Sequence, residues 1–160
     1  MDRRAFIGAG ALLTLAAGGF VAADGQNLFY TALTPAFSGA EIDAPTAHAQ
    51  ATAGDIILVD IRRPDEWART GSGAGAHRID LRDTDFAEKV LAAAGGNADA
   101  PIALICARGV RSARTSNQLF ANGFTNIIDV PEGMLGSAAG PGWLKRGLPL
   151  VHDNYVPPGA

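Results

Sequence analysis

The sequence has few of the residues that build disulfide frameworks or metal centres. It contains one cysteine, Cys106, and three histidines that lie far apart in the chain. A single cysteine cannot form an internal disulfide, and no two histidines have the spacing of a helical metal-binding motif. We therefore predict a domain without a disulfide, a metal ion or another bound cofactor.

Positive charge is scarce as well. The chain carries 13 lysines and arginines against 16 aspartates and glutamates, which gives a net charge of −3. Without residues 1–23, which include Asp2, Arg3 and Arg4, 11 basic residues remain against 15 acidic ones, or −4. Nucleic-acid binding depends on a basic face, so this mildly acidic chain is predicted to bind no nucleic acid.

Glycine is plentiful, but no glycine-rich stretch has the context of a nucleotide site. The cluster at residues 71–75 follows no predicted strand, and neither Lys89 nor Lys145 is preceded by a glycine. A dinucleotide fingerprint opens a helix directly after a strand, and a phosphate-binding loop ends in Gly-Lys. We therefore expect no bound nucleotide.

The N-terminus is predicted to be an export signal. Arg3 and Arg4 precede an apolar run, residues 5–23, that ends in small residues. This order is typical of a signal peptide, and cleavage after Ala23 would release the protein into the periplasm. The arginine pair with Phe6 resembles a twin-arginine signal. The alternative is an inner-membrane anchor, because these 19 residues approach the length that spans a bilayer.

The rest of the chain is predicted to form one α/β domain. Short apolar runs predict buried strands, and segments with helical periodicity lie between them. The expected strands are 56–59, 102–105 and 127–130, and the expected helices are 64–68, 85–94 and 111–122. Strands without polar alternation favour a central, mostly parallel sheet flanked by helices. We place a linker at 24–40, the domain at 41–151 and a C-terminal tail at 152–160.

The residues around Cys106 favour a reactive thiol. Cys106 follows a predicted strand, and Gly109 and Arg111 lead from it into the next helix. In parallel sheets, ligands bind at the carboxyl ends of strands. The free N–H groups at a helix start favour negative charge and therefore the nucleophilic thiolate. Gly109 also allows successive N–H groups to turn inward and form an anion-binding nest.

Charge near the cysteine also points to anion chemistry. No acidic residue occurs between Asp99 and Asp129, whereas Arg108, Arg111 and Arg114 all lie in this interval. From this count we expect only positive formal charge around Cys106, which would stabilise a thiolate, a persulfide or a bound anion. Arg114 is explained equally well as a solvated helix residue.

Three motifs resemble the rhodanese-like family of sulfurtransferases and occur in that family's order. They are Cys106-Ala107-Arg108-Gly109-Val110-Arg111-Ser112, Asp60-Ile61-Arg62-Arg63-Pro64-Asp65-Glu66-Trp67, and Gly142-Trp143 with Gly147-Leu148-Pro149-Leu150. The first resembles the family's active-site loop, and the resemblance covers about residues 41–151. The chain departs from the family pattern at residues 70–77 and between Glu132 and Trp143. We expect these departures to reshape the edges that face the substrate.

The resemblance implies a single rhodanese-like domain that transfers sulfur in two steps. Cys106 would take the outer sulfur of a small anionic donor such as thiosulfate, and the resulting persulfide would pass it to a thiol or to cyanide. The implied substrate-binding residues are Ala107, Arg108, Gly109, Val110 and Arg111. Asp60 and Arg62 would hold neighbouring loops, and Ser112 would form a hydrogen bond at the helix start.

Two other functions remain open at this point. A rhodanese-like domain could receive sulfur or dock a partner without turnover, because a fold does not determine a function. A cysteine phosphatase or arsenate reductase has five residues between its cysteine and arginine, whereas four separate Cys106 from Arg111. The shorter loop is the length of the sulfur-transferring family and leaves less room for a phosphate group.

Overall fold

The computed structural model describes residues 26–152. The predicted signal or anchor at residues 1–23 lies outside the described residues, as do residues 24 and 25 of the linker and 153–160 of the tail. Between residues 26 and 152, no helix has both the length and the apolar character needed to cross a membrane.

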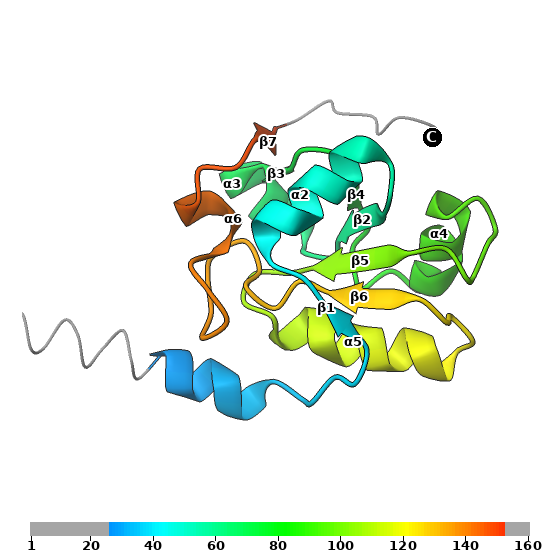
Figure 1. Ribbon diagram of the computed structural model, residues 1–160, viewed down its shortest axis with the longest axis horizontal. Helices are drawn as coiled ribbons and strands as arrows, with labels where there is room; N and C mark the ends of the chain where they lie inside the picture. The colour runs from blue at the N-terminus through cyan, green and yellow to red at the C-terminus, as the bar shows by residue number, and fades with distance from the viewer. Residues whose placement is uncertain (1–25, 153–160) are drawn as a thin grey trace, which may run out of the picture.

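Five parallel strands form the central sheet (Figure 1). They are β1 (Ala40–Glu41), β2 (Ile57–Asp60), β4 (His77–Arg78), β5 (Ile102–Ile105) and β6 (Ile127–Asp129), in the spatial order β1-β6-β5-β2-β4. The middle strand, β5, pairs with β2 and β6, and Cys106 follows it directly. The prediction of an α/β domain with a mostly parallel central sheet is confirmed.

Helices cover both faces of this sheet and bury its apolar side chains in two layers (Figure 1). The helices are α2 (Ala44–Ala53), α3 (Pro64–Thr70), α4 (Phe86–Ala93), α5 (Val110–Ala121) and α6 (Gly142–Lys145). Leu104 and Cys106 point to the layer that contains α4 and α5, whereas Ala103 and Ile105 point to the layer of α2 and α6. This alternation follows from the two-residue period of a strand. It places the Cys106 side chain on the α5 side.

The segment before β1, which we predicted to be a linker at 24–40, contains a helix that the sequence pattern did not indicate. Residues 26–33 form a helix, drawn in blue in Figure 1. The hydroxyl of Thr31 donates to the carbonyl oxygen of Asn27 at 2.8 Å, and that of Thr34 donates to the carbonyl oxygen of Tyr30 at 2.8 Å. These local bonds support a short helix whose side chains show no apolar period, which is why the sequence pattern did not predict it.

A second, antiparallel sheet joins the C-terminal end of the domain to residues 72–73. It consists of β3 (Ser72–Gly73) and β7 (Leu150–Val151). Trp143 lies fully buried beside it and donates from its indole N–H to the carbonyl oxygen of Pro149 at 2.9 Å. A Cβ atom at Gly73 would lie 2.7 Å from the Trp143 ring, so this position requires glycine. Packing against Trp143 therefore explains the glycine in the middle of the glycine-rich stretch.

Candidate functional site

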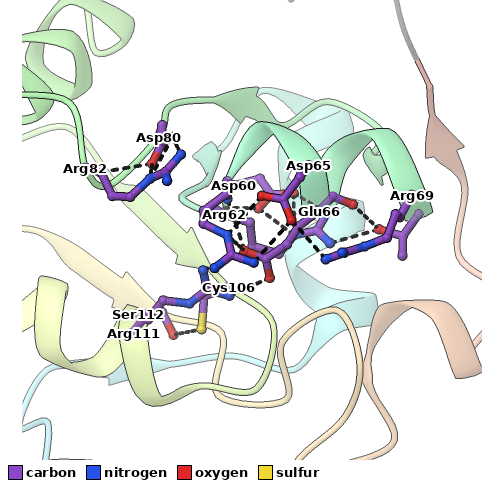
Figure 2. Close-up of polar contacts among 12 residues, drawn as sticks. Asp60, Arg62, Asp65, Glu66, Arg69, Asp80, Arg82, Cys106, Arg111 and Ser112 are labelled. Carbon is purple, nitrogen blue, oxygen red and sulfur yellow. Dashed lines mark hydrogen bonds and ion pairs between the residues drawn. The ribbon is translucent and has the colours of Figure 1, made fainter.

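Cys106 lies at the carboxyl end of β5, where the chain turns into α5. The residue is buried, and its thiol donates to the hydroxyl oxygen of Ser112 over 3.6 Å (Figure 2). The Ser112 hydroxyl in turn donates to the carbonyl oxygen of Gly109 at 3.1 Å. Ser112 therefore contacts the sulfur atom directly, in addition to the role at the helix start that we expected.

Two carbonyl groups of the loop from Cys106 to α5 are bonded to the turn that follows β6. Met134 and Leu135 donate their backbone N–H groups to the carbonyl oxygens of Cys106 and Ala107 at 2.8 and 2.9 Å. Within the described part of the chain, none of the N–H groups of residues 107–112 donates to a backbone carbonyl. These free donors at a helix start are the components of an anion-binding site.

Gly109 makes this loop conformation possible. Its φ is 85°, which is a left-handed conformation that other residues rarely adopt. A Cβ atom at this position would also collide with the carbonyl oxygen of Pro131. A glycine is thus required twice, once for the backbone angle and once for the close approach of the neighbouring loop.

Arg111 is paired with a carboxylate that the local sequence does not reveal. Its Nη1 and Nη2 atoms donate to Glu66 at 2.8 and 2.7 Å. Burial would raise the pKa of Glu66, but the hydrogen bonds from Arg111 and from the Arg63 N–H, with both guanidinium charges, lower the pKa to about 2. Glu66 raises the pKa of Arg111 in return, against the effect of burial. The expectation of only positive charge around Cys106 is therefore wrong, because α3 brings a carboxylate to the site.

The other two arginines of the predicted charge cluster lie differently. Arg108 donates to the carbonyl oxygen of Gly136 at 3.1 Å, and its guanidinium lies 5.1 Å from the centre of the Tyr30 ring. This arrangement is a cation–π contact. Arg114 is exposed to solvent on α5, which agrees with its interpretation as a solvated residue.

Asp60 and Arg62 form a buried network beside the site rather than a part of it (Figure 2). Arg62 Nη2 lies 2.7 Å from Asp60 Oδ2, which also accepts the Ser72 hydroxyl at 2.7 Å. Arg62 further donates to the Thr70 hydroxyl and to the carbonyl oxygen of Gly71, at 2.8 and 2.7 Å. The pair thus connects the end of β2 to the end of α3 and to β3.

An open cleft of about 450 Å³ lies above Cys106. Its lining residues are Tyr30, Leu33, Arg63, Glu66, Cys106, Ala107, Arg108, Val110, Arg111 and Leu135. Five of the six predicted catalytic and substrate-binding residues are in this set, and the sixth, Gly109, lines an adjoining hollow. Tyr30, Leu33 and Leu135 were not predicted, because they belong to two segments without a recognisable motif.

Asp129, at the end of β6, is a second acidic residue near the site that the sequence did not indicate. It is 1% exposed, and its Oδ1 atom has no hydrogen-bond partner among the described residues. Burial raises the pKa of this carboxyl to about 7, partly offset by a hydrogen-bonding interaction with Ser112. The nearby charge of Glu41 acts in the same direction as burial.

Between residues 26 and 152, no three or more histidine, cysteine, aspartate or glutamate side chains are grouped so that they could hold a metal ion. The arrangement at Cys106 offers instead one thiol, a set of free N–H donors and an ion-paired guanidinium. Chemically, these groups suit a sulfur nucleophile that reacts with an anion.

Solved structures of other proteins share this architecture. The polysulfide-sulfur transferase homodimer of Wolinella succinogenes is 23% identical, with 86% of this chain and 90% of that chain covered and a TM-score of 0.55. A rhodanese-related protein of Thermoplasma volcanium is 28% identical, with 70% and 97% covered and a TM-score of 0.52. A Rhodopseudomonas palustris protein described as a possible tyrosine phosphatase is 20% identical, with 94% and 99% covered and a TM-score of 0.52.

A comparison with curated proteins gives no match. The family model described as the rhodanese-like domain matches residues 43–139. That interval contains β2, α3, β5, the Cys106 loop and α5, which are the elements that build the site. The chain therefore belongs to the rhodanese-like domain family.

Proposed function

We propose that this protein is a sulfurtransferase that carries sulfane sulfur as a persulfide on Cys106. The observation that carries the proposal is the position of this thiol in front of α5, surrounded by a loop whose N–H groups are free. A nucleophile and a site for an anion thus occur at the same point. The similarity to a polysulfide-sulfur transferase supports this class of reaction.

In the first step, the Cys106 thiolate attacks the outer sulfur of thiosulfate or a related donor. A new S–S bond forms at Cys106 while the S–S bond of the donor breaks, and sulfite leaves with the bonding electron pair. The N–H groups of residues 107–112 bind the anionic donor and then the terminal sulfur of the persulfide. Arg111 adds positive charge, which Glu66 holds in a fixed orientation.

In the second step, an acceptor thiolate or cyanide attacks the terminal sulfur of the persulfide. The S–S bond to Cys106 breaks, and the thiolate is regenerated for the next turnover. The chain has no second cysteine, so the persulfide cannot be displaced as an internal disulfide and must be released to an external acceptor.

A turnover assay with thiosulfate and cyanide tests the proposal. We expect thiocyanate to form with the wild-type protein and not with Cys106→Ser, while circular dichroism shows the same fold for both. Persulfide formation without turnover would support the alternative of a domain that receives sulfur or docks a partner. Hydrolysis of aryl phosphates at a higher rate than sulfur transfer would support the phosphatase alternative.

We also propose that the protein acts in the periplasm, either free or attached to the inner membrane. The support is the sequence of residues 1–23, in which Arg3 and Arg4 precede an apolar run that ends in small residues. The donor and the acceptor would then be molecules that occur in that compartment.

A further inference from the structure

The walls of the cleft above Cys106 are apolar at the side that faces solvent. Tyr30 and Leu33 come from the helix at residues 26–33, and Leu135 comes from the turn that follows β6. Leu33 and Leu135 are 46% and 43% exposed, although each lines the same cleft as the buried thiol. A shallow apolar surface is thus placed beside the nucleophile and is left uncovered by the rest of the described chain.

Contacts with the domain hold the helix at residues 26–33 in this position. Arg108 packs on the Tyr30 ring at 5.1 Å from its centre. The amide of Asn117 on α5 donates to the carbonyl oxygen of Ala36 at 3.0 Å, and the rings of Phe37 and Phe120 are 5.7 Å apart. The helix is therefore attached to the Cys106 loop through Tyr30 and to α5 through residues 36 and 37, which follow the helix.

The cleft is larger than an inorganic sulfur anion requires. Thiosulfate has five heavy atoms and would fill roughly 150 Å³ if each atom took the ~30 Å³ of one water molecule. The cleft measures about 450 Å³, which lies in the range of sites that bind small organic molecules. Space for an organic group remains after the sulfur-bearing end of a donor is placed at Cys106.

The positive charge of the cleft favours an anionic group at the sulfur-bearing end of the ligand. Three arginines line the cleft, Arg63, Arg108 and Arg111, against the single carboxylate of Glu66. Arg63 also pairs with Asp65, which lies outside the cleft lining, at 3.0 Å. The formal sum stays positive when this carboxylate is included, and the free N–H groups of the Cys106 loop add partial positive charge. The ligand that matches both ends carries an anionic sulfur group and an apolar body.

We propose that the cleft accepts sulfane-sulfur anions with an apolar organic group, such as aryl thiosulfonates, in preference to inorganic thiosulfate. This inference rests on the proposed function. The loop N–H groups and Arg111 hold the anionic end, while Leu33, Leu135 and the Tyr30 ring cover the organic group. These three side chains are specificity-determining residues that act on the body of the substrate and not on the reacting sulfur.

The reaction with such a donor is balanced in atoms and charge. The Cys106 thiolate attacks the terminal sulfur of benzenethiosulfonate, and an S–S bond forms at Cys106. The sulfur–sulfur bond of the donor breaks, and benzenesulfinate leaves with the electron pair. The thiolate and benzenethiosulfonate each carry one negative charge before the reaction, and the persulfide and benzenesulfinate each carry one after it.

The test compares kcat/KM for benzenethiosulfonate and for thiosulfate in the full chain, with cyanide as the acceptor. We expect the wild type to use the aryl donor at least tenfold more efficiently. In the double variant Leu33→Ala/Leu135→Ala, the ratio of the two values should fall about tenfold, because two apolar contacts with the aryl group are removed. Leu28→Ala is the control, since Leu28 is exposed on the same helix and does not line the cleft. Phe29 is left in place because its ring packs on the Tyr30 ring.

The outcomes separate this inference from the proposed function. A wild-type ratio near one overturns the inference, and so does an equal ratio in the wild type and the Leu33→Ala/Leu135→Ala variant. A fall in the ratio in the Leu28→Ala control also overturns it, because the effect would then come from the helix surface in general. If neither donor transfers sulfur, although iodoacetamide alkylates Cys106 in the folded protein, the proposed function itself fails.

Discussion

Arg111 of the Cys106 loop donates two hydrogen bonds to the carboxylate of Glu66, although the two residues are 45 positions apart in the chain. The pair joins the start of α5 to the first turn of α3, so the two motifs that resemble the family meet at one ion pair (Figure 2). A paired carboxylate fixes the direction of a planar guanidinium. Glu66 is therefore a positioning residue for the group that would attract the donor anion.

Glu66→Gln is expected to lower the free energy of unfolding at pH 7 by about 1–3 kcal/mol. The folded-state pKa of about 2 lies below the ordinary value of 4.5, so the ionised form stabilises the fold above pH 4.5. This contribution is lost as the pH falls from 4.5 towards 2. Urea unfolding of both proteins at pH 7 and pH 3 measures this effect. The difference in unfolding free energy between the wild type and the variant should be smaller at pH 3. Asp65→Asn, which removes an exposed carboxylate on the same helix, serves as the control.

Asp129→Asn is expected to have the opposite pH dependence. The folded-state pKa of about 7 lies above the ordinary value of 3.8, so ionisation of this buried group opposes folding. The penalty is absent below pH 4, grows as the pH rises to 7 and reaches at most about 4 kcal/mol, at 1.36 kcal/mol per pKa unit. The difference in unfolding free energy, variant minus wild type, should therefore be more positive at pH 8 than at pH 5. An equal difference at both pH values, or the same trend in the exposed control Asp55→Asn, would contradict this assignment.

Gly109→Ala should abolish most sulfur transfer, because the new methyl group collides with the Pro131 carbonyl and the left-handed angle is strained. We expect a loss of at least tenfold in kcat/KM for thiosulfate and a loss of about 1–2 kcal/mol in unfolding free energy. Gly54→Ala is a matched control, since Gly54 has a φ of 80° at the end of α2 and open space where its Cβ would lie. Gly54→Ala should lower the unfolding free energy through backbone strain but leave kcat/KM unchanged. Equal turnover of both variants would show that the loop geometry is not needed.

Replacing Arg3 and Arg4 by lysine tests the twin-arginine route. The exchange keeps the charge but removes the planar, fork-shaped donors of the guanidinium groups. The variant should accumulate in the cytoplasmic fraction with residues 1–23 attached, as intact-mass analysis of the fractions would show. Export at the wild-type level would exclude that route but not export itself. Uncleaved wild-type protein in the membrane fraction would identify residues 5–23 as an anchor.

The strands at the centre of the fold could be predicted because each is a continuous apolar run. Residues 56–59, 102–105 and 127–130 correspond within one residue at each end to β2, β5 and β6. The four strands β1, β3, β4 and β7 have only two residues each, which is too short for any period to be visible. Their pairing depends on contacts with strands that lie far away in the sequence.

The same distinction explains which parts of the site were predicted. The Cys106 loop is one contiguous motif, so its residues could be identified together. The partner of Arg111 comes from α3, and the wall formed by Tyr30 and Leu33 comes from a helix without an apolar period. The burial of Asp129 likewise depends on the packing of α5 against β6. These contacts join residues that lie far apart in the chain, so no local sequence motif predicts them.

The central claim is that Cys106 carries sulfur, and intact-protein mass spectrometry after incubation with thiosulfate tests it most directly. We expect the wild type to gain the mass of one sulfur atom, to lose it on addition of dithiothreitol or cyanide, and to show the added atom on the peptide that contains Cys106. Cys106→Ser should gain no mass under the same conditions. The absence of an adduct on the folded wild type, with thiosulfate, benzenethiosulfonate or a polysulfide, would contradict the account, as would an equal adduct on Cys106→Ser.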